Sequence, residues 1–173
     1  KLMKQGVIIK RSSIVETLGS TTVICTDKTG TITENSMKLK VLFDFKSNQV
    51  FDDKSFNKSE LSELIQFAMW SSEPVPFDPM EKTLHKVYEA TQTSDQRKDF
   101  QIIHEYPLDG KPPMMTHIFE NNSGERIIAA KGAPEAIIAN SNLSKTETQQ
   151  INVAIESMSK EGFRVLGVGV SKF

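Results

Sequence analysis

Cysteine is nearly absent from the sequence, since Cys25 is the only one among 173 residues. A lone cysteine excludes an internal disulfide framework and is typical of a reducing compartment. No apolar run approaches the roughly 20 residues that a helix needs to cross a bilayer. The sequence also lacks a large net charge, because its 21 lysines and arginines nearly balance its 22 acidic residues. We therefore expect no global attraction to nucleic acid or anionic lipid.

The composition is that of a globular chain. With 38% hydrophobic and 25% charged residues, the sequence can bury one core, or one domain plus part of a second. It starts at Lys1 with neither an initiator methionine nor a signal peptide, so we expect a piece cut from a longer protein.

Hydrophobic periodicity predicts an α+β fold, with a mainly antiparallel sheet flanked by helices and a short α/β segment at the N-terminal end. Strands are expected at 6–10, 21–26, 37–45, 101–106, 114–120, 126–131 and 163–170. Helices are expected over 134–139, after Ser59, and after three capping boxes: Ser13 with Glu16, Asp78 with Glu81, and Ser144 with Glu147. The turn residues Asn121, Asn122 and Gly124 predict a hairpin.

The segment VICTDKTGTIT, residues 23–33, carries the strongest chemical signal. Asp27 follows an apolar run, and functional groups collect where strands of α/β sheets end. A carboxylate is ionised at neutral pH and can attack phosphorus, while Lys28, hydroxyls and the N–H groups near Gly30 balance phosphate charge. Asp27 and the carbonyl of Thr29 would suit half of a Mg²⁺ site. An exposed turn is the alternative interpretation.

The string CTDKTGTIT followed by ENSM resembles the phosphorylation signature of P-type ATPases, with Asp27 at the phosphorylated position. GVIIKRSSIVETLG resembles the approach to that site in type II, calcium-pump-like cation pumps. FDPMEKTL, KGAPEAI and GFRVLGV resemble elements of the nucleotide domain, in the family's order. The resemblance implies that 1–33 begin the phosphorylation domain and that 34–173 form the nucleotide-binding domain.

Within that domain, the resemblance places Glu81, Lys131 and Arg164 around ATP. Lys131 ends an apolar strand, and Gly132 would permit a close approach of the nucleotide. Each residue also has a structural alternative. Lys131 can be an ordinary strand-end lysine, Glu81 a capping glutamate, and Arg164 a solvated strand residue.

In the family an aromatic ring stacks on the adenine, just upstream of a lysine. Here EYPLDGKPPMM offers Tyr106 and Lys111, with Phe77 as the reserve ring. Stacking contributes on the order of 1 to 3 kcal/mol per base. A tyrosine packed under its own turn is the alternative.

Two other function classes fit parts of the sequence. Soluble phosphatases of the haloacid dehalogenase type, which carry a cap domain, resemble one another in having a second aspartate two residues after the first, as general acid and base. Thr29 stands there in this chain, which favours a longer-lived aspartyl-phosphate. A nucleotide-binding module without catalysis is the other alternative.

The resemblance therefore implies a cytoplasmic piece of a membrane-bound pump that uses ATP and Mg²⁺. Its partners would be ATP and the remaining transmembrane, actuator and phosphorylation segments, and the piece itself would be a monomer that does not span the membrane. The family's TGD and GDGxND-like strings do not occur here. We therefore expect nucleotide binding without turnover.

Overall fold

The computed structural model describes residues 4, 6, 8, 10–11, 13–28, 30–108 and 111–171. The chain divides into two compact units, Lys1–Asn35 and Ser36–Phe173. Each is described by itself below.

The first unit contains one helix among its described residues, α1 (Ser13–Gly19). The helix begins at Ser13 itself, so the predicted capping box from Ser13 to Glu16 is wrong. The strand predicted at 21–26 is also wrong, because this segment is irregular there. Val23 and Ile24 are 73% and 77% exposed, and a lone apolar segment without a neighbouring strand cannot form ladder hydrogen bonds. The strand predicted at 6–10 lies partly outside the described residues, and none of those that are described is in a strand.

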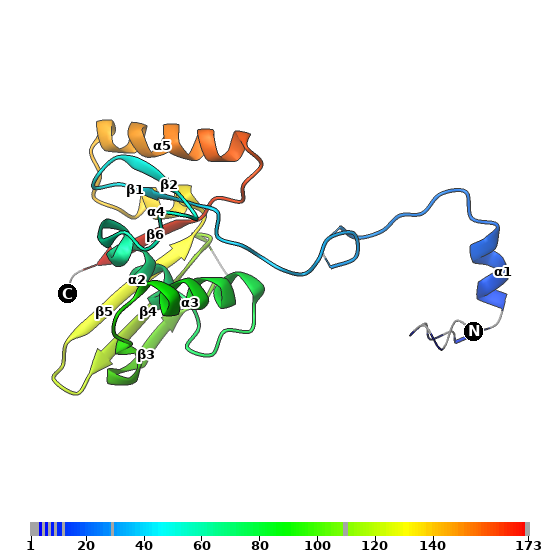
Figure 1. Cartoon of the computed structure of the whole chain (residues 1–173), viewed down its shortest axis with the longest axis horizontal. Helices are drawn as coiled ribbons and strands as arrows, with labels where there is room; N and C mark the ends of the chain where they lie inside the picture. Colours follow the sequence, from blue (N-terminus) through cyan, green and yellow to red (C-terminus); the bar gives the residue numbers. More distant parts are fainter. Residues whose placement is uncertain are drawn as a thin grey trace. The chain divides into compact units, whose positions relative to one another are not determined.

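The second unit is built on a four-stranded antiparallel sheet in the order β3-β4-β5-β6 (Figure 1). Its strands are β3 (Phe100–Tyr106), β4 (Met114–Asn121), β5 (Arg126–Gly132) and β6 (Gly167–Ser171). The α+β prediction and the hairpin at Asn121 are confirmed. β6 starts four residues later than predicted, because Gly167 pairs with Gly132, where β5 ends.

A small separate hairpin joins β1 (Val41–Asp44) to β2 (Gln49–Asp52). The prediction for 37–45 is thus correct only in its second half, and β2 was not predicted. Phe51 is the only buried residue of β2, so the alternation of buried and exposed residues in this strand is too short to recognise in the sequence. Asn48 closes the turn with φ +53°, a conformation that asparagine tolerates.

The helices follow the predicted starts, with two corrections. Their bounds are α2 (Ser62–Trp70), α3 (Pro79–Thr91), α4 (Pro134–Ala139) and α5 (Lys145–Lys160), with 3₁₀ turns η2 (Ser59–Leu61) and η3 (Gln96–Asp99). The box of Ser144 and Glu147 at α5 is confirmed. Ser59 does not cap a helix, since it begins η2 without a side-chain cap. Asp78 does cap α3, by accepting from the N–H of Met80, but Glu81 does not close a box there.

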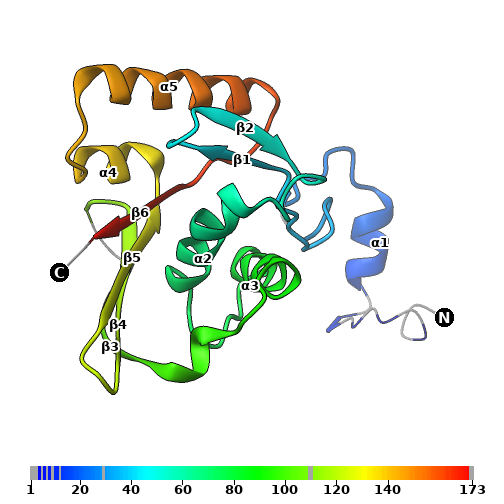
Figure 2. The ribbon, with the colours of Figure 1, turned by 60° about the vertical axis from the view of Figure 1, so that its left-hand side comes forward.

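The core lies between the sheet and α2, and α3 covers α2 on its far side (Figure 2). Trp70, at the end of α2, packs against Phe119 with ring centroids 4.7 Å apart. The opposite sheet face receives α4, whose Ile137 contacts β6. A Cβ added at Gly167 would lie 2.9 Å from that side chain, so only glycine permits this packing.

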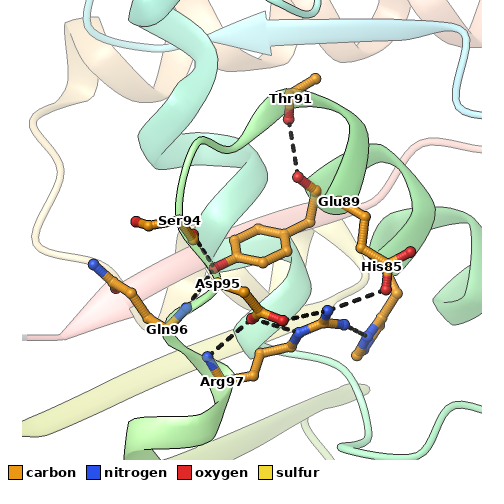
Figure 3. Close-up of polar contacts among 8 residues, drawn as sticks. His85, Glu89, Thr91, Ser94, Asp95, Gln96 and Arg97 are labelled. Atoms are coloured by element: carbon orange, nitrogen blue, oxygen red, sulfur yellow. Dashed lines mark hydrogen bonds and ion pairs between the residues drawn. The ribbon is translucent and has the colours of Figure 1, made fainter.

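Arg97 ties η3 to α3 (Figure 3). Its guanidinium forms ion pairs with Asp95 at 2.8 Å and Glu89 at 3.1 Å, and lies over the Tyr88 ring. Burial lowers the pKa of His85, and the Arg97 charge lowers it further. A guanidinium can only donate, so Nδ1 of neutral His85 accepts from Arg97 at 3.1 Å.

This cluster predicts an acid-sensitive contribution to stability. Hydrogen bonding to Arg97 lowers the pKa of Asp95 to about 2, whereas an unfolded aspartate titrates near 3.9. The stabilisation is therefore present above pH ~4 and lost as the pH falls toward ~2. Because the Asp95 side chain is 40% exposed, we expect only about 1 kcal/mol. In urea unfolding, Asp95→Asn should flatten the slope of stability between pH 4 and 2. Asp99→Asn changes an exposed acid in the same turn and should leave the slope intact; equal slopes in all three proteins would contradict the assignment.

Candidate functional site

In the first unit, Asp27 lies in an exposed loop after the irregular segment. Its Oδ1 accepts the backbone N–H of Lys28 at 2.7 Å. The carbonyl of Lys28 accepts from the N–H groups of Ile32 and Thr33, and Gly30 takes φ +75°, which closes a tight turn. Thr29 lies outside the described residues. An accessible carboxylate on a tight turn fits one half of a Mg²⁺ site, since Mg²⁺ prefers oxygen ligands.

In the second unit, three elements meet at a buried ion pair. Nζ of Lys131, near the end of β5, donates to Oε1 of Glu81 at 2.6 Å. It also donates to Oγ of Ser72, two residues after the end of α2, at 2.9 Å. Lys131 is 3% exposed and Glu81 is 5% exposed. An ammonium this deep is stable only with such partners.

The sequence places Glu81 there by helical spacing. Glu81, Leu84, His85 and Tyr88 are the buried residues of α3, at intervals that form one helix face. Glu81 is therefore an inward-facing residue of the first turn and not a capping residue, which corrects the local prediction. Its Oε1 also accepts the N–H of Glu73 at 3.4 Å.

Electrostatics around Lys131 act in two directions. Burial lowers the pKa of Lys131, and this effect outweighs the raising effect of Glu81, Asp78 and Glu73. The lysine therefore lies in an acidic surrounding and still gives up its proton more easily than a lysine in water. Such a lysine gains from any additional anionic group that reaches it.

A cavity of about 460 Å³ has Lys131 and Arg164 in its lining. The rest of the lining is mainly apolar and comes from β1, α2, α4, α5 and the segment 163–170. The structure thus brings Arg164, which is exposed and precedes β6, to the same hollow as Lys131. Pockets that are mostly apolar with few charged groups are typical of ligand sites.

The structure does not bring Tyr106 to this cavity. Tyr106 ends β3, is 56% exposed and pairs with Thr116, whereas the partner of Lys131 is Met115. Neighbouring residues of a strand face opposite sides, so Tyr106 and Lys131 lie on opposite faces of the sheet. Lys111 is exposed in the β3–β4 connection, and Phe77 is 78% exposed just before α3.

Gly132 has a packing role in the structure. A Cβ at this position would lie 2.4 Å from both the Cα of Met114 and the carbonyl oxygen of Pro113. The close approach that glycine allows is therefore that of the β4 backbone.

Sequence reasoning missed Ser72 and Glu73, which contact Lys131 and Glu81, and it also missed the buried histidine His117 in β4. The alternation of Met115, His117 and Phe119 in β4 would have placed His117 in the core. The local sequence carries no signal that would have joined Ser72 to Lys131, 59 residues away.

Residues 77–173, more than half of the chain, match the family described as P-type ATPase, cytoplasmic domain N. The chain is 30% identical to a probable cation-transporting P-type ATPase of Mycoplasma genitalium, over 98% of this chain and 19% of that protein. It is 27% identical to calcium-transporting ATPase 1 of Bacillus cereus, over 100% of this chain and 21% of that protein. It is 30% identical to the potassium-transporting ATPase alpha chain 2 of Homo sapiens, over 96% and 20% respectively.

The chain belongs to the P-type cation ATPase family. It spans about a fifth of the length of these relatives. Within the part that the structure describes, every helix is too short or too polar to cross a bilayer.

The ion pair predicts strong coupling between its two residues. Glu81→Gln leaves the Lys131 ammonium buried without its counter-charge and should cost about 3 to 5 kcal/mol in urea unfolding. In the double variant with Lys131→Met, the cost should be well below the sum of the single costs. The matched control is the exposed pair of Lys160 and Glu156 at 2.7 Å, where the same substitutions should couple by less than about 0.5 kcal/mol. Additive costs at Glu81 and Lys131 would contradict a buried ion pair.

Proposed function

We propose that the second unit binds ATP at the cavity next to Lys131. The observation that carries this proposal is a buried lysine, held by Glu81 and Ser72, in the lining of the same hollow as Arg164. Two cations at one cavity suit the negative charge of a polyphosphate. A carboxylate beside them suits the amino group of adenine, because it can only accept hydrogen bonds.

Lys131 gains from such a ligand. Its pKa is lowered by burial, so an incoming anion favours its charged form. To meet that ligand, the side chain exchanges part of its contact with Glu81, and Glu81 becomes available to the base. Lys131 and Glu81 would thus each exchange one hydrogen-bond partner for another, and neither would be left unpaired. This matters because an unpaired polar group in a buried pocket is costly.

The outer contacts belong to exposed residues. We assign Arg164 to phosphate or ribose, Lys111 to phosphate, and Gly132 to the backbone beside the nucleotide. Tyr106 remains the proposed stacking ring. Tyr106 lies on the sheet face opposite Lys131, so it would reach the cavity only after a local rearrangement of the end of β3. Phe77, four residues before Glu81, is therefore the alternative ring.

For the whole protein we propose ATP-driven cation transport across a membrane through a phosphorylated Asp27, as the names of the relatives suggest. Lys28 and Thr29 would contact the phosphoryl group, and Mg²⁺, held by Asp27 and the Thr29 carbonyl, would supply positive charge against it. This chain would lie on the cytoplasmic side and cooperate with the transmembrane, actuator and remaining phosphorylation segments. Alone it would bind nucleotide without turnover.

Titration of the 173-residue chain with ATP tests the pocket. Backbone amide NMR signals near Glu81, Lys131 and Arg164 should shift at millimolar ATP. Arg164→Gln should weaken binding roughly ten-fold, equivalent to 1.4 kcal/mol, because it removes one charged contact. Lys98→Gln removes an exposed lysine of η3 and should change nothing. Absence of shifts at the three positions would refute the pocket.

A second comparison selects the ring. Loss of base stacking, worth about 1 to 3 kcal/mol, corresponds to roughly 5- to 150-fold weaker binding. We expect this loss in Tyr106→Ala and not in Phe77→Ala. Since both side chains are mostly exposed, neither substitution should disturb folding. The reverse result would assign the stacking to Phe77.

Phosphorylation is tested in the parent protein with radiolabelled ATP. Acid-stable label should disappear in Asp27→Asn, because an amide cannot form the acyl phosphate. Asp99→Asn, an exposed acid in the other unit, should retain it. Persistent label in Asp27→Asn would exclude this residue as the nucleophile.

A further inference from the structure

A histidine and two glutamates from three segments converge beside α2. Glu73 follows α2, Glu105 lies near the end of β3, and His117 lies in the middle of β4. Their ligand atoms, one from each residue, are all within 4.8 Å of one another. Glu105 and His117 are paired across the ladder, so their side chains share one sheet face. Oε1 of Glu73 lies 4.0 Å from Nε2 of His117.

His117 is the unusual member of the cluster. Its side chain is 0% exposed, and among the described residues neither ring nitrogen has a hydrogen-bond partner. A buried polar group without a partner costs about 1 to 3 kcal/mol. The Glu73 carboxylate does not relieve this cost, because 4.0 Å is beyond hydrogen-bond distance.

We propose that His117, Glu73 and Glu105 form a binding site for a divalent transition-metal ion of the Zn²⁺ class. An imidazole nitrogen with two carboxylate oxygens is a donor set that suits Zn²⁺ and disfavours Mg²⁺, which prefers oxygen alone. Ligands at about 2.0 to 2.2 Å from a tetrahedral ion lie roughly 3.3 to 3.6 Å from one another. The ligand atoms, now up to 4.8 Å apart, therefore have to approach by about 1 Å, and the exposed Glu105 is free to move inward.

The surrounding charge favours a cation at this place. Glu73 also acts on Lys131, together with Glu81 and Asp78, and Glu105 adds a further carboxylate beside Glu73. The site borders the ATP pocket, since the N–H of Glu73 donates to Glu81. It is nevertheless independent of the proposed nucleotide function, because none of its three ligand residues is assigned to ATP.

Zn²⁺ titration of the ¹⁵N-labelled 173-residue chain tests the site. One equivalent should bind and shift a ring-nitrogen signal of His117, a readout that needs neither ATP nor activity. Glu105→Gln and Glu73→Gln should each weaken Zn²⁺ binding at least about ten-fold while leaving the fold intact, because neither side chain is buried. Millimolar Mg²⁺ should leave the His117 signal unchanged.

His104→Gln is the matched control. His104 is an exposed β3 residue adjacent to Glu105 but on the other sheet face, because it pairs with Ile118. Its replacement should leave both affinity and the His117 shift unaltered. An unshifted His117 ring, or affinity that survives both glutamate substitutions, would overturn the proposal. Either result would leave the ATP pocket untouched, since that pocket is tested with a different ligand.

Discussion

The buried ion pair between Lys131 and Glu81 is the contact on which the second unit depends, because it joins the sheet, α3 and the end of α2 at one point. Removing an ammonium from water costs several kcal/mol, and only a well-placed carboxylate and hydroxyl offset that cost. The pair therefore adds little net stability but allows only one arrangement of the three elements. An alternative packing would leave a charge buried without its partner, which is far more costly than a misplaced methyl group.

The same pair explains why local sequence rules succeeded in some elements and failed in others. The hairpin at Asn121 and the box of Ser144 at α5 were predictable, because each signal and its partner lie within a few residues. Glu81 has the spacing of a capping glutamate after Asp78, yet its carboxylate binds a lysine 50 residues away. The capping pattern alone cannot decide between these two uses, because the competing partner comes from a strand that is distant in the sequence. The stripe of Leu84, His85 and Tyr88 is the sequence signal that settles it.

The errors in the first unit have a different origin. The run from Val23 to Cys25 has the composition of a buried strand, but composition specifies burial only where neighbouring strands supply hydrogen bonds and a covering layer. In the candidate site the limits are similar. Lys131 and Arg164 were identified through the resemblance, and their common cavity appears only in three dimensions. The sequence also does not show which sheet face Tyr106 occupies relative to Lys131, because one step along a strand reverses the side chain.

Under the proposed function, the ion pair would also limit how tightly a nucleotide binds. If Lys131 and Glu81 satisfy each other, the binding-competent arrangement is a minor state, and the apparent dissociation constant rises by the inverse of its population. A cost of about 2.7 kcal/mol for opening the pair would reduce affinity roughly 100-fold. We would then expect the second unit alone to bind nucleotide weakly, because of the same Lys131–Glu81 ion pair that fixes its packing. If a separate unit also held the phosphate chain of the nucleotide, this cost would be offset. Binding to the second unit would then be an intramolecular step with a high effective concentration. Under the proposed function, affinity for nucleotide would therefore depend on whether a separate unit engages the same ligand.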